Sequence, residues 1–296
     1  MNMNRPSYQL SNSYLSISIN AMGAELSSIK KDDLEYLWQA DVKCWGRHAP
    51  ILFPIVGRLL DDEYNYKGVT YSMGQHGFAR DQDFKVVKKT TNSMTFELVS
   101  DEDLYQVYPF DFVLQVKYTL VDATLQVEYL VKNPSTHDDL LFSIGAHPAF
   151  SCPIEKGQNR AEYQLKFDLE TAPVAYLAEN AYYNGETVEV ISPNGVLNLS
   201  DTLFDRGSLT FRPNSFAKAA LIHRPSGKEY LSMSFENYPY LAIWSKDQWS
   251  PFVCIEPWHG IADHINHNKE LSQKTGVIRL TPEKQFMCSY KIEIYA

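Results

Sequence analysis

The feature that most constrains the fold of this chain is a long stretch in which apolar and polar residues alternate. From residue 112 to residue 120 every second residue is apolar, and the alternation resumes over 125–131 after the turn-forming residues 122–124. Because successive side chains of a β-strand point to opposite faces of a sheet, this pattern predicts two strands that each bury one face. The short turn between them predicts a β-hairpin.

Similar alternating runs occur along the whole chain, each bounded by Pro, Asn, Gly or Asp. They lie at residues 15–19, 230–235, 240–244 and 289–295. Helical periodicity is nearly absent, and only two short segments, 45–48 and 263–268, are expected to be helical. Helices this short cannot cover the faces of a parallel sheet. The sequence therefore predicts an all-β fold built as an antiparallel sandwich or barrel.

The domain organisation follows from what separates these runs. We find no linker rich in Gly, Ser or Pro, no low-complexity segment and no internal repeat with a period of about 20 to 50 residues. Sandwiches and barrels often exceed about two hundred residues as one unit. We therefore expect residues 1–296 to form a single domain.

Charge and composition exclude several classes of function. The formal net charge is −9 and the basic residues are scattered, which argues against a nucleic-acid partner. No stretch approaches the roughly 20 apolar residues that span a bilayer, so we expect no membrane insertion. The four cysteines lie far apart, without a C-x-x-C pair, and the N-terminus lacks the apolar run of a signal peptide. These features predict a cytoplasmic protein with reduced thiols.

Three titratable residues stand in segments that hold little other charge. Glu256 follows the apolar run 252–255 and precedes Pro257, so we expect it where a buried strand ends, with its pKa raised by desolvation. His147 follows another strand-like run, and His76 lies in a turn-like segment. Proton-transfer chemistry needs such groups on rigid elements. From the residues alone, a salt-bridged glutamate, a core histidine and an exposed loop histidine stay open as alternatives.

Arginines form a second group of candidates. Arg58 ends the apolar run 51–57, and Arg47 and Arg80 flank the same region. The planar donor fork of an arginine suits hydroxyl, carboxylate or phosphate oxygens, although many arginines serve only surface solubility. Aromatic residues can stack on the apolar face of a sugar ring or simply fill a core. The candidates of this kind are Trp45, Phe78, Trp244 and Trp258.

Two other patterns carry little weight. His259, His264 and His267 fall within nine residues, but their separations match no zinc-binding signature, so we expect no metal site there. Ser143 and Ser151 lie near His147, yet the chain has no G-x-S-x-G elbow and no parallel framework to hold one. A serine hydrolase is therefore not predicted.

Four segments together resemble the aldose 1-epimerase, or galactose mutarotase-like, superfamily, and most of all its LacX-like branch. In chain order they are GRHAPILFPIVGRL (46–59), GQHGFARDQDF (74–84), FSIGAHPAF (142–150) and VCIEPWHG (253–260). The resemblance covers roughly residues 8–295. It implies a large antiparallel β-supersandwich, of the galactose mutarotase-like type, with a sugar cleft across one sheet.

The resemblance also implies an activity and roles for individual residues. Glu256 matches the family's general base, which takes the proton of the anomeric hydroxyl, and His147 matches the general acid, which protonates the ring oxygen. His76 and Arg58 match residues that position the substrate. The implied protein is an isomerase that interconverts the α and β anomers of a hexose, binds no cofactor or metal, and has a small-molecule sugar as its partner.

Three points are left open at this stage. Galactose mutarotases bind sugar hydroxyls with an aspartate between the second histidine and the glutamate, and Asp205 and Asp201 are the candidates here. Arg47 and Arg80 resemble the arginines of the branch that acts on hexose 6-phosphates, so the sugar can be free or phosphorylated. Two other functions fit the same fold: a carbohydrate-binding or sensing protein, and an epimerase or lyase acting elsewhere on the sugar.

Overall fold

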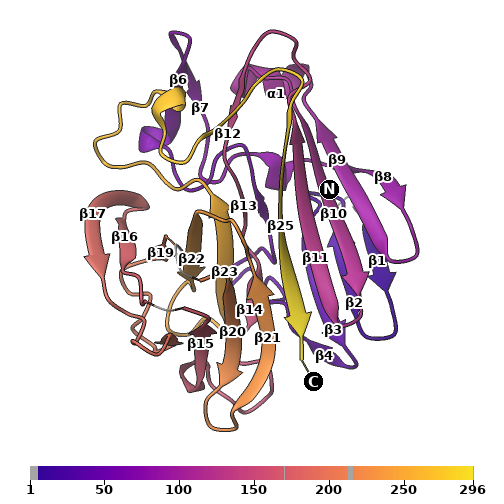
Figure 1. The fold of residues 1–296 in the computed structure, drawn as a ribbon, viewed down its shortest axis with the longest axis vertical. Coiled ribbons are helices and arrows are strands. Elements are labelled where there is room, and N and C mark those ends of the chain that lie inside the picture. Colours follow the sequence, from indigo (N-terminus) through magenta and orange to yellow (C-terminus); the bar gives the residue numbers. More distant parts are fainter. Residues whose placement is uncertain (1–5, 170, 213–215, 296) are drawn as a thin grey trace.

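Two large antiparallel sheets make up most of the protein. The computed structural model describes residues 6–169, 171–212 and 216–295, and within these residues nearly all regular structure is β (Figure 1). One sheet has nine strands in the order β18-β15-β20-β21-β25-β11-β10-β9-β8. Its strands are β8 (Lys85–Lys89), β9 (Ser93–Val99), β10 (Val113–Val121), β11 (Thr124–Lys132), β15 (Tyr163–Phe167), β18 (Val196–Asn198), β20 (Lys218–His223), β21 (Lys228–Ser234) and β25 (Gln285–Ile294).

The second large sheet has eight strands. Seven follow the order β17-β16-β19-β22-β23-β13-β5, and β14 pairs with β23 outside that path. Its strands are β5 (Ile51–Leu52), β13 (Ile144–Ala146), β14 (Ala149–Ser151), β16 (Ala175–Glu179), β17 (Tyr182–Val188), β19 (Leu209–Phe211), β22 (Tyr240–Trp244) and β23 (Phe252–His259).

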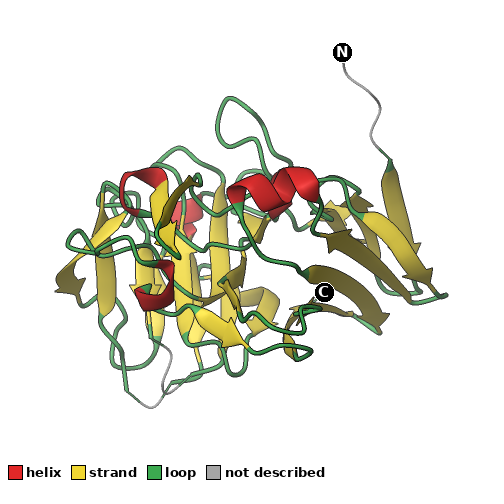
Figure 2. Ribbon diagram, turned by 90° about the horizontal axis from the view of Figure 1, so that it is seen from above, coloured by secondary structure: helices red, strands yellow, loops and turns green. Residues whose placement is uncertain are grey.

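Smaller elements complete the fold. A four-stranded sheet contains β1 (Ser7–Ser11), β2 (Ser16–Asn20), β3 (Leu26–Lys31) and β4 (Leu34–Glu35), and two pairs join β6 (Glu63–Tyr66) with β7 (Val69–Ser72) and β12 (Leu140–Phe142) with β24 (Ile278–Leu280). The helical segments are short, as Figure 2 shows. They are the helix α1 (Glu102–Val107) and four 3₁₀ turns at Leu60–Asp62, Ala79–Asp81, Arg160–Glu162 and Leu271–Gln273.

The hairpin predicted from the alternating pattern is confirmed. β10 and β11 pair antiparallel along their whole length, from Val113 opposite Lys132 to Val121 opposite Thr124. Their buried and less buried residues alternate strictly, because one face packs into the core and the other faces away from it. The predicted strands at 15–19, 230–235, 240–244 and 289–295 are present as β2, β21, β22 and β25.

The main core lies between the two large sheets. Leu114 and Val127 of the nine-stranded sheet belong to the same buried cluster as Ile243 and Ile255 of the eight-stranded sheet. The all-β fold class is thus confirmed, whereas the single domain expected for residues 1–296 stays a prediction. Among the described residues, no helix combines the length and the apolar character needed to cross a membrane.

Both segments that were expected to be helical are irregular, so these two predictions were wrong. In 45–48 the N–H of His48 donates to the side chain of Glu25. In 263–268 the N–H groups of Asp263 and Ile265 donate to backbone carbonyls of distant segments. These tertiary bonds replace the bonds within a helix. The helix α1, which was not predicted, begins at Asp101, whose side chain accepts the N–H of Leu104.

Strand β23 also differs from expectation, because it does not end at Glu256. It continues through Pro257 to His259, and Pro257 stays opposite Leu241 of β22. On the other side of β23, the paired residues nearest to the proline are Trp258 and Cys254. The pairing on this side of β23 is therefore interrupted at Pro257. The N–H that a proline lacks is not needed there for a hydrogen bond between strands.

Candidate active site

A cavity of about 300 Å³ lies against the eight-stranded sheet and collects most of the candidate residues. This volume is at the lower end of the range of about 300 to 1,000 Å³ that is usual for small-molecule sites. We call it the central cavity. It is lined by Trp45, Gly57, Gln75, His76, Arg80, His147, Ala178, Ala181, Tyr183, Gly207, Ser208, Trp244, Glu256, Trp258 and Ala262.

The pairing of the strands explains why His147 and Glu256 meet. β23 pairs with β13 through Gly145 opposite Trp258, and with β14 through Ala149 opposite Cys254. Both pairs follow one register, and in that register His147 is opposite Glu256. The break between β13 and β14 frees the histidine from the ladder, and its Nε2 lies 3.2 Å from Oε2 of Glu256.

Burial controls the electrostatics of this pair. The side chain of Glu256 is 1% exposed and that of His147 is 9% exposed. Burial raises the pKa of the Glu256 carboxyl group well above its ordinary value, and it lowers the pKa of His147 to about 3. Both shifts favour uncharged side chains, so burial opposes an ion pair between Glu256 and His147 in the free protein.

Aromatic rings hold the imidazole of His147 in place. The indole of Trp45 stacks on it with ring centroids 4.9 Å apart, and Trp244 meets it edge-on at 5.7 Å. Gly145, two residues before His147, allows the close approach of another indole, because a Cβ there would lie 2.6 Å from the ring of Trp258. The two rings limit the rotation of the histidine.

His76 forms the adjoining wall of the central cavity. Its Nδ1 accepts the backbone N–H of Gly57 at 3.1 Å, so in the neutral ring the proton is on Nε2, which lies 3.2 Å from the side-chain amide of Gln75. Burial, followed by the charge of His147, lowers its pKa well below the ordinary value. Its ring meets that of His147 edge-on at 5.6 Å. His76 is therefore a neutral hydrogen-bonding group with a fixed tautomer.

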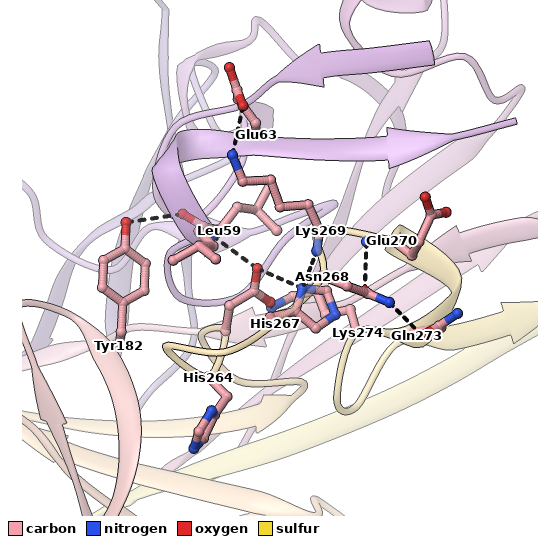
Figure 3. A network of polar contacts seen from close by, with 12 residues as sticks. Leu59, Glu63, Tyr182, His264, His267, Asn268, Lys269, Glu270, Gln273 and Lys274 are labelled. Carbon is pink, nitrogen blue, oxygen red and sulfur yellow. Dashed lines mark hydrogen bonds and ion pairs between the residues drawn. The ribbon is translucent and has the colours of Figure 1, made fainter. Parts of the chain in front are cut away.

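A buried ion pair joins Asp263 and Lys274, and Figure 3 shows Lys274 within the surrounding network of polar contacts. Lys274 is fully buried and donates to Asp263 at 2.8 Å and to the carbonyl of Ile261 at 2.7 Å. Asp263 also accepts the N–H of Leu60 at 3.0 Å, and its own N–H donates to the carbonyl of Arg58. These bonds join the segment that contains Gly57 to the segment that contains Ala262. The two segments touch so closely that a Cβ on Gly57 would lie 2.4 Å from the backbone of Ala262.

The arginines predicted from the sequence occupy different places. Arg80 lines the central cavity, and its Nη2 donates to the carbonyl of Gln75 at 2.6 Å. Burial, followed by the charge of Arg47, lowers its pKa to about 10. Arg47 is not among the lining residues and pairs with Asp81 at 2.9 Å. Arg58 is also outside the lining, where it holds Asp62 through two hydrogen bonds of 2.8 and 2.7 Å.

Neither candidate aspartate lies in the central cavity. Asp205 is exposed and lines a neighbouring hollow, which shares Ala178, Ala181 and Gly207 with the central cavity. Asp201 lines a separate hollow beside Arg160. Among the described residues that line the central cavity, Glu256 is the only carboxylate.

Some lining residues were missed by sequence reasoning, and one aromatic candidate lies elsewhere. Tyr183 and Gln75 line the cavity, and the hydroxyl of Tyr183 donates to Thr210 at 2.7 Å. No local pattern distinguishes Tyr183 from the other tyrosines of the chain. Phe78 packs with the core aromatics Phe53 and Tyr108 instead of lining the cavity.

The three clustered histidines do not share one environment. His259 packs against Tyr238 and Phe286. The Nδ1 of His264 accepts the N–H of Asn266, while the Nδ1 of His267 lies 3.2 Å from Asp263. Each ring is thus accounted for by its own packing or hydrogen bonding.

The raised pKa of Glu256 makes a prediction about stability. The folded state binds the proton of the Glu256 carboxyl group more tightly than the unfolded chain does. The contribution of this proton to the free energy of unfolding is complete below pH 4.5, the ordinary glutamate pKa, and is lost as the pH rises through the pKa of the folded state. Glu256→Gln, which resembles the protonated form, should therefore unfold at higher urea than the wild type at pH 8. The gain should be about 1.4 kcal/mol for each unit of difference between the two pKa values.

Urea unfolding of both proteins at pH 4 and pH 8 measures this effect. Glu236→Gln, a substitution at an exposed glutamate, serves as the control. Its difference in stability from the wild type should be the same at pH 4 and pH 8. A Glu256→Gln variant that is less stable than the wild type at pH 8 would contradict the inferred burial of a protonated carboxyl group.

Comparison with known proteins agrees with this architecture. The sequence model of the family described as aldose 1-epimerase matches residues 6–279. The chromosomal LacX protein of Lactococcus lactis subsp. lactis is 33% identical over 295 residues, which covers 97% of this chain and 98% of that protein. A galactose mutarotase related enzyme from Lactobacillus acidophilus is 35% identical, with a TM-score of 0.92 and 98% of both chains covered. A galactose mutarotase-like protein from Lactobacillus casei ATCC 334 is 31% identical, with a TM-score of 0.91 over 98% of this chain and 100% of that one.

Proposed function

The chain belongs to the aldose 1-epimerase family, and we propose that it is a mutarotase that interconverts the α and β anomers of a hexose. The observation that carries this proposal is the buried pair of His147 and Glu256, 3.2 Å apart, in a cavity lined by aromatic and polar side chains. Ring opening of a sugar requires one group that removes a proton from the anomeric hydroxyl and another that protonates the ring oxygen.

The reaction transfers two protons and breaks one bond. Glu256 takes the proton of the anomeric hydroxyl, and His147 donates a proton to the ring oxygen as the bond between that oxygen and the anomeric carbon breaks. The products are an aldehyde and a free hydroxyl. Rotation about the bond next to the aldehyde exposes its other face, and reclosure with the roles reversed gives the other anomer.

The pKa shifts of the free protein describe the state before sugar binds. Burial then favours the proton on Glu256, whereas ring opening by the family assignment starts from a carboxylate and an imidazolium. The two states differ only in the position of one proton. The hydroxyl groups of a bound sugar hydrogen-bond to the charged side chains and so favour the charged state.

The other lining residues orient the ring. His76 offers a hydrogen bond from a fixed tautomer, and the indoles of Trp244 and Trp258 supply apolar surface for a sugar face. Correct orientation contributes to the rate because the acid and the base must reach the two oxygens together. Arg58 acts on this arrangement through its backbone, since its guanidinium is engaged by Asp62.

The substrate is a free hexose or a hexose 6-phosphate, and Arg80 is the residue proposed to contact a phosphate. Its guanidinium lines the cavity, whereas Arg47 is held outside the lining by Asp81. A contact with phosphate would therefore depend on one arginine instead of two. A charged partner also suits a guanidinium that is largely buried.

A panel of sugars tests both the activity and the role of Arg80. Interconversion of the anomers of galactose, glucose and glucose 6-phosphate is followed by saturation-transfer NMR, and we expect acceleration over a protein-free blank. Arg80→Ala should raise KM for glucose 6-phosphate at least about tenfold, as loss of a charge-assisted contact implies, and Arg47→Ala should not. Failure to accelerate any of the three sugars would contradict the proposal.

A further inference from the structure

A thiol, an imidazole and a carboxylate meet beside the central cavity, which His147 and Glu256 line and Cys254 does not. A ring nitrogen of His147, the sulfur of Cys254 and a carboxylate oxygen of Glu256 all lie within 4.8 Å of one another, and all three residues are buried. The proposed proton transfers use His147 and Glu256 but give Cys254 no role. Cys254 is a free cysteine, so its sulfur is available as a ligand.

The sheet itself produces this grouping. Cys254 and Glu256 are two residues apart on β23 and so project from the same face. Cys254 lies opposite Ala149, two residues after His147 on the neighbouring segment. Ala149 and Phe252 form a buried cluster with Cys254, and Trp45 and Trp244 pack against that cluster. These positions belong to rigid elements, which favours a preformed site.

The distances suit one small cation. Zinc binds sulfur at about 2.3 Å and nitrogen or oxygen at about 2.0 to 2.2 Å in a tetrahedron, which places neighbouring ligand atoms roughly 3.3 to 3.6 Å apart. The nitrogen of His147 and the oxygen of Glu256 are already 3.2 Å apart. Because the sulfur is within 4.8 Å of both, a small rotation of the Cys254 side chain would complete three corners.

The charge also balances. A thiolate and a carboxylate carry two negative charges, the imidazole binds as a neutral ligand, and a divalent zinc ion makes the buried group neutral. A neutral group avoids the large cost of burying an uncompensated charge. The mixed nitrogen, oxygen and sulfur donors favour Zn²⁺ over the hard cations Mg²⁺ and Ca²⁺. His147 and Glu256 line the central cavity, so a water molecule from the cavity can supply the fourth ligand.

We propose that His147, Cys254 and Glu256 form a zinc-binding site that overlaps the proton-transfer pair, so that zinc inhibits the enzyme reversibly. Binding displaces the thiol proton and the proton held by the pair, and it occupies the lone pairs that proton transfer requires. Inhibition rests on the proposed mutarotase activity, whereas zinc binding does not.

The binding test uses cobalt as a spectroscopic probe and needs no sugar. The protein is first stripped of metal with a chelator, and Co²⁺ is then added. A cobalt ion bound to a thiolate gives a charge-transfer absorption band in the near ultraviolet, which Zn²⁺ removes by displacement. We expect this band in the wild type and in the control Cys152→Ser, because Cys152 is equally buried but lies outside the site. Cys254→Ser and Cys254→Ala should lack it.

Calorimetric titration with Zn²⁺ gives the affinity. Loss of the thiolate should weaken binding by at least about 10- to 100-fold, the loss that follows even from removing an outer partner of a ligand. Thermal unfolding of both Cys254 variants shows whether each is folded, and either folded variant suffices for the test. Equal zinc affinity in the wild type and the Cys254 variants, or no cobalt band in the wild type, would overturn the proposal.

The activity test separates this proposal from the proposed function. Zinc should inhibit the wild type and Cys152→Ser, and a chelator should restore both. Cys254→Ser should keep its activity within about twofold and resist the same zinc concentration, since the cysteine has no part in proton transfer. A protein with the cobalt band but no mutarotase activity would refute the function and leave the site intact. A protein with mutarotase activity but no cobalt band would refute the zinc site and leave the proposed function intact.

Discussion

Replacement of Glu256 by glutamine is expected to reduce the interconversion of anomers to a rate near that of the protein-free blank. A positioned general base contributes about 10²- to 10⁴-fold to a proton-transfer step, and Glu256 is the only carboxylate among the described residues that line the cavity. No neighbouring carboxylate can therefore take its place. The amide is nearly the same size, so the cavity keeps its shape.

This effect can be separated from loss of folding. Glu256→Gln should remain folded, and at neutral pH it should be more stable than the wild type, because it removes a carboxyl group whose ionisation is unfavourable in the fold. Circular dichroism and thermal unfolding check the fold, and saturation-transfer NMR measures the rate. The exposed Glu236→Gln should keep full activity. Full activity in Glu256→Gln would reject the assigned base.

Replacement of His147 by glutamine is expected to lower kcat by about 10²- to 10³-fold, with a smaller change in KM. In the proposed mechanism the histidine exchanges its proton with the reacting oxygen, whereas Trp45, which stacks on it, and the other lining residues would still bind the sugar. The double variant His147→Gln/Glu256→Gln should lose little more than the worse single variant, because the two residues act as a unit on one bond.

Steady-state kinetics of the two single variants and the double variant measure this coupling. The matched control is His259→Gln, because His259 is another histidine of the same sheet but packs against Tyr238 and Phe286 outside the cavity. Losses that multiply in the double variant would show that His147 and Glu256 act independently, contrary to the mechanism. A change confined to KM would make His147 a binding residue only.

The sequence predicted the fold class because alternation is a direct record of strand geometry. Residues 112–131 alternate over two strands, and β10 and β11 bury the expected faces. The pattern fails where both faces of a strand are covered. In β23 the residues Val253 and Ile255 face the main core, while Cys254 and Glu256 face the cavity side, and all four are buried. The strand was expected to end at Glu256 because a charged residue and Pro257 follow the apolar run 252–255, yet β23 buries Glu256 and continues to His259.

Tertiary contacts explain the remaining differences. In the segment 263–268, the N–H groups of Asp263 and Ile265 donate to two other parts of the chain instead of to a helix, and no local pattern encodes those partners. Arg58 is a second example, because its position at the end of the apolar run 51–57 suggested that its side chain binds a ligand. Its partner is Asp62, one helical turn away in sequence, so the charge is satisfied without a sugar.

The candidate site was only partly accessible from sequence. Glu256, His147, His76 and Arg80 were singled out by their motifs, and the structure brings all four to one cavity. Their roles in catalysis and binding stay predictions. That His147 stands opposite Glu256 follows from the register of β13, β14 and β23, and a register between distant strands cannot be read from one sequence. Tyr183 and Cys254 were missed for the same reason.

The proposed mutarotase mechanism is best tested by the rate of anomer exchange catalysed by the wild-type protein in D₂O with galactose, glucose and glucose 6-phosphate. For at least one of these sugars, we expect exchange that rises in proportion to protein concentration while the hydrogens on carbon are retained, because only oxygen-bound protons move. Exchange at the rate of the blank, despite saturated binding, would contradict it and identify a sugar-binding protein. Deuterium on carbon would contradict it in favour of an epimerase or lyase.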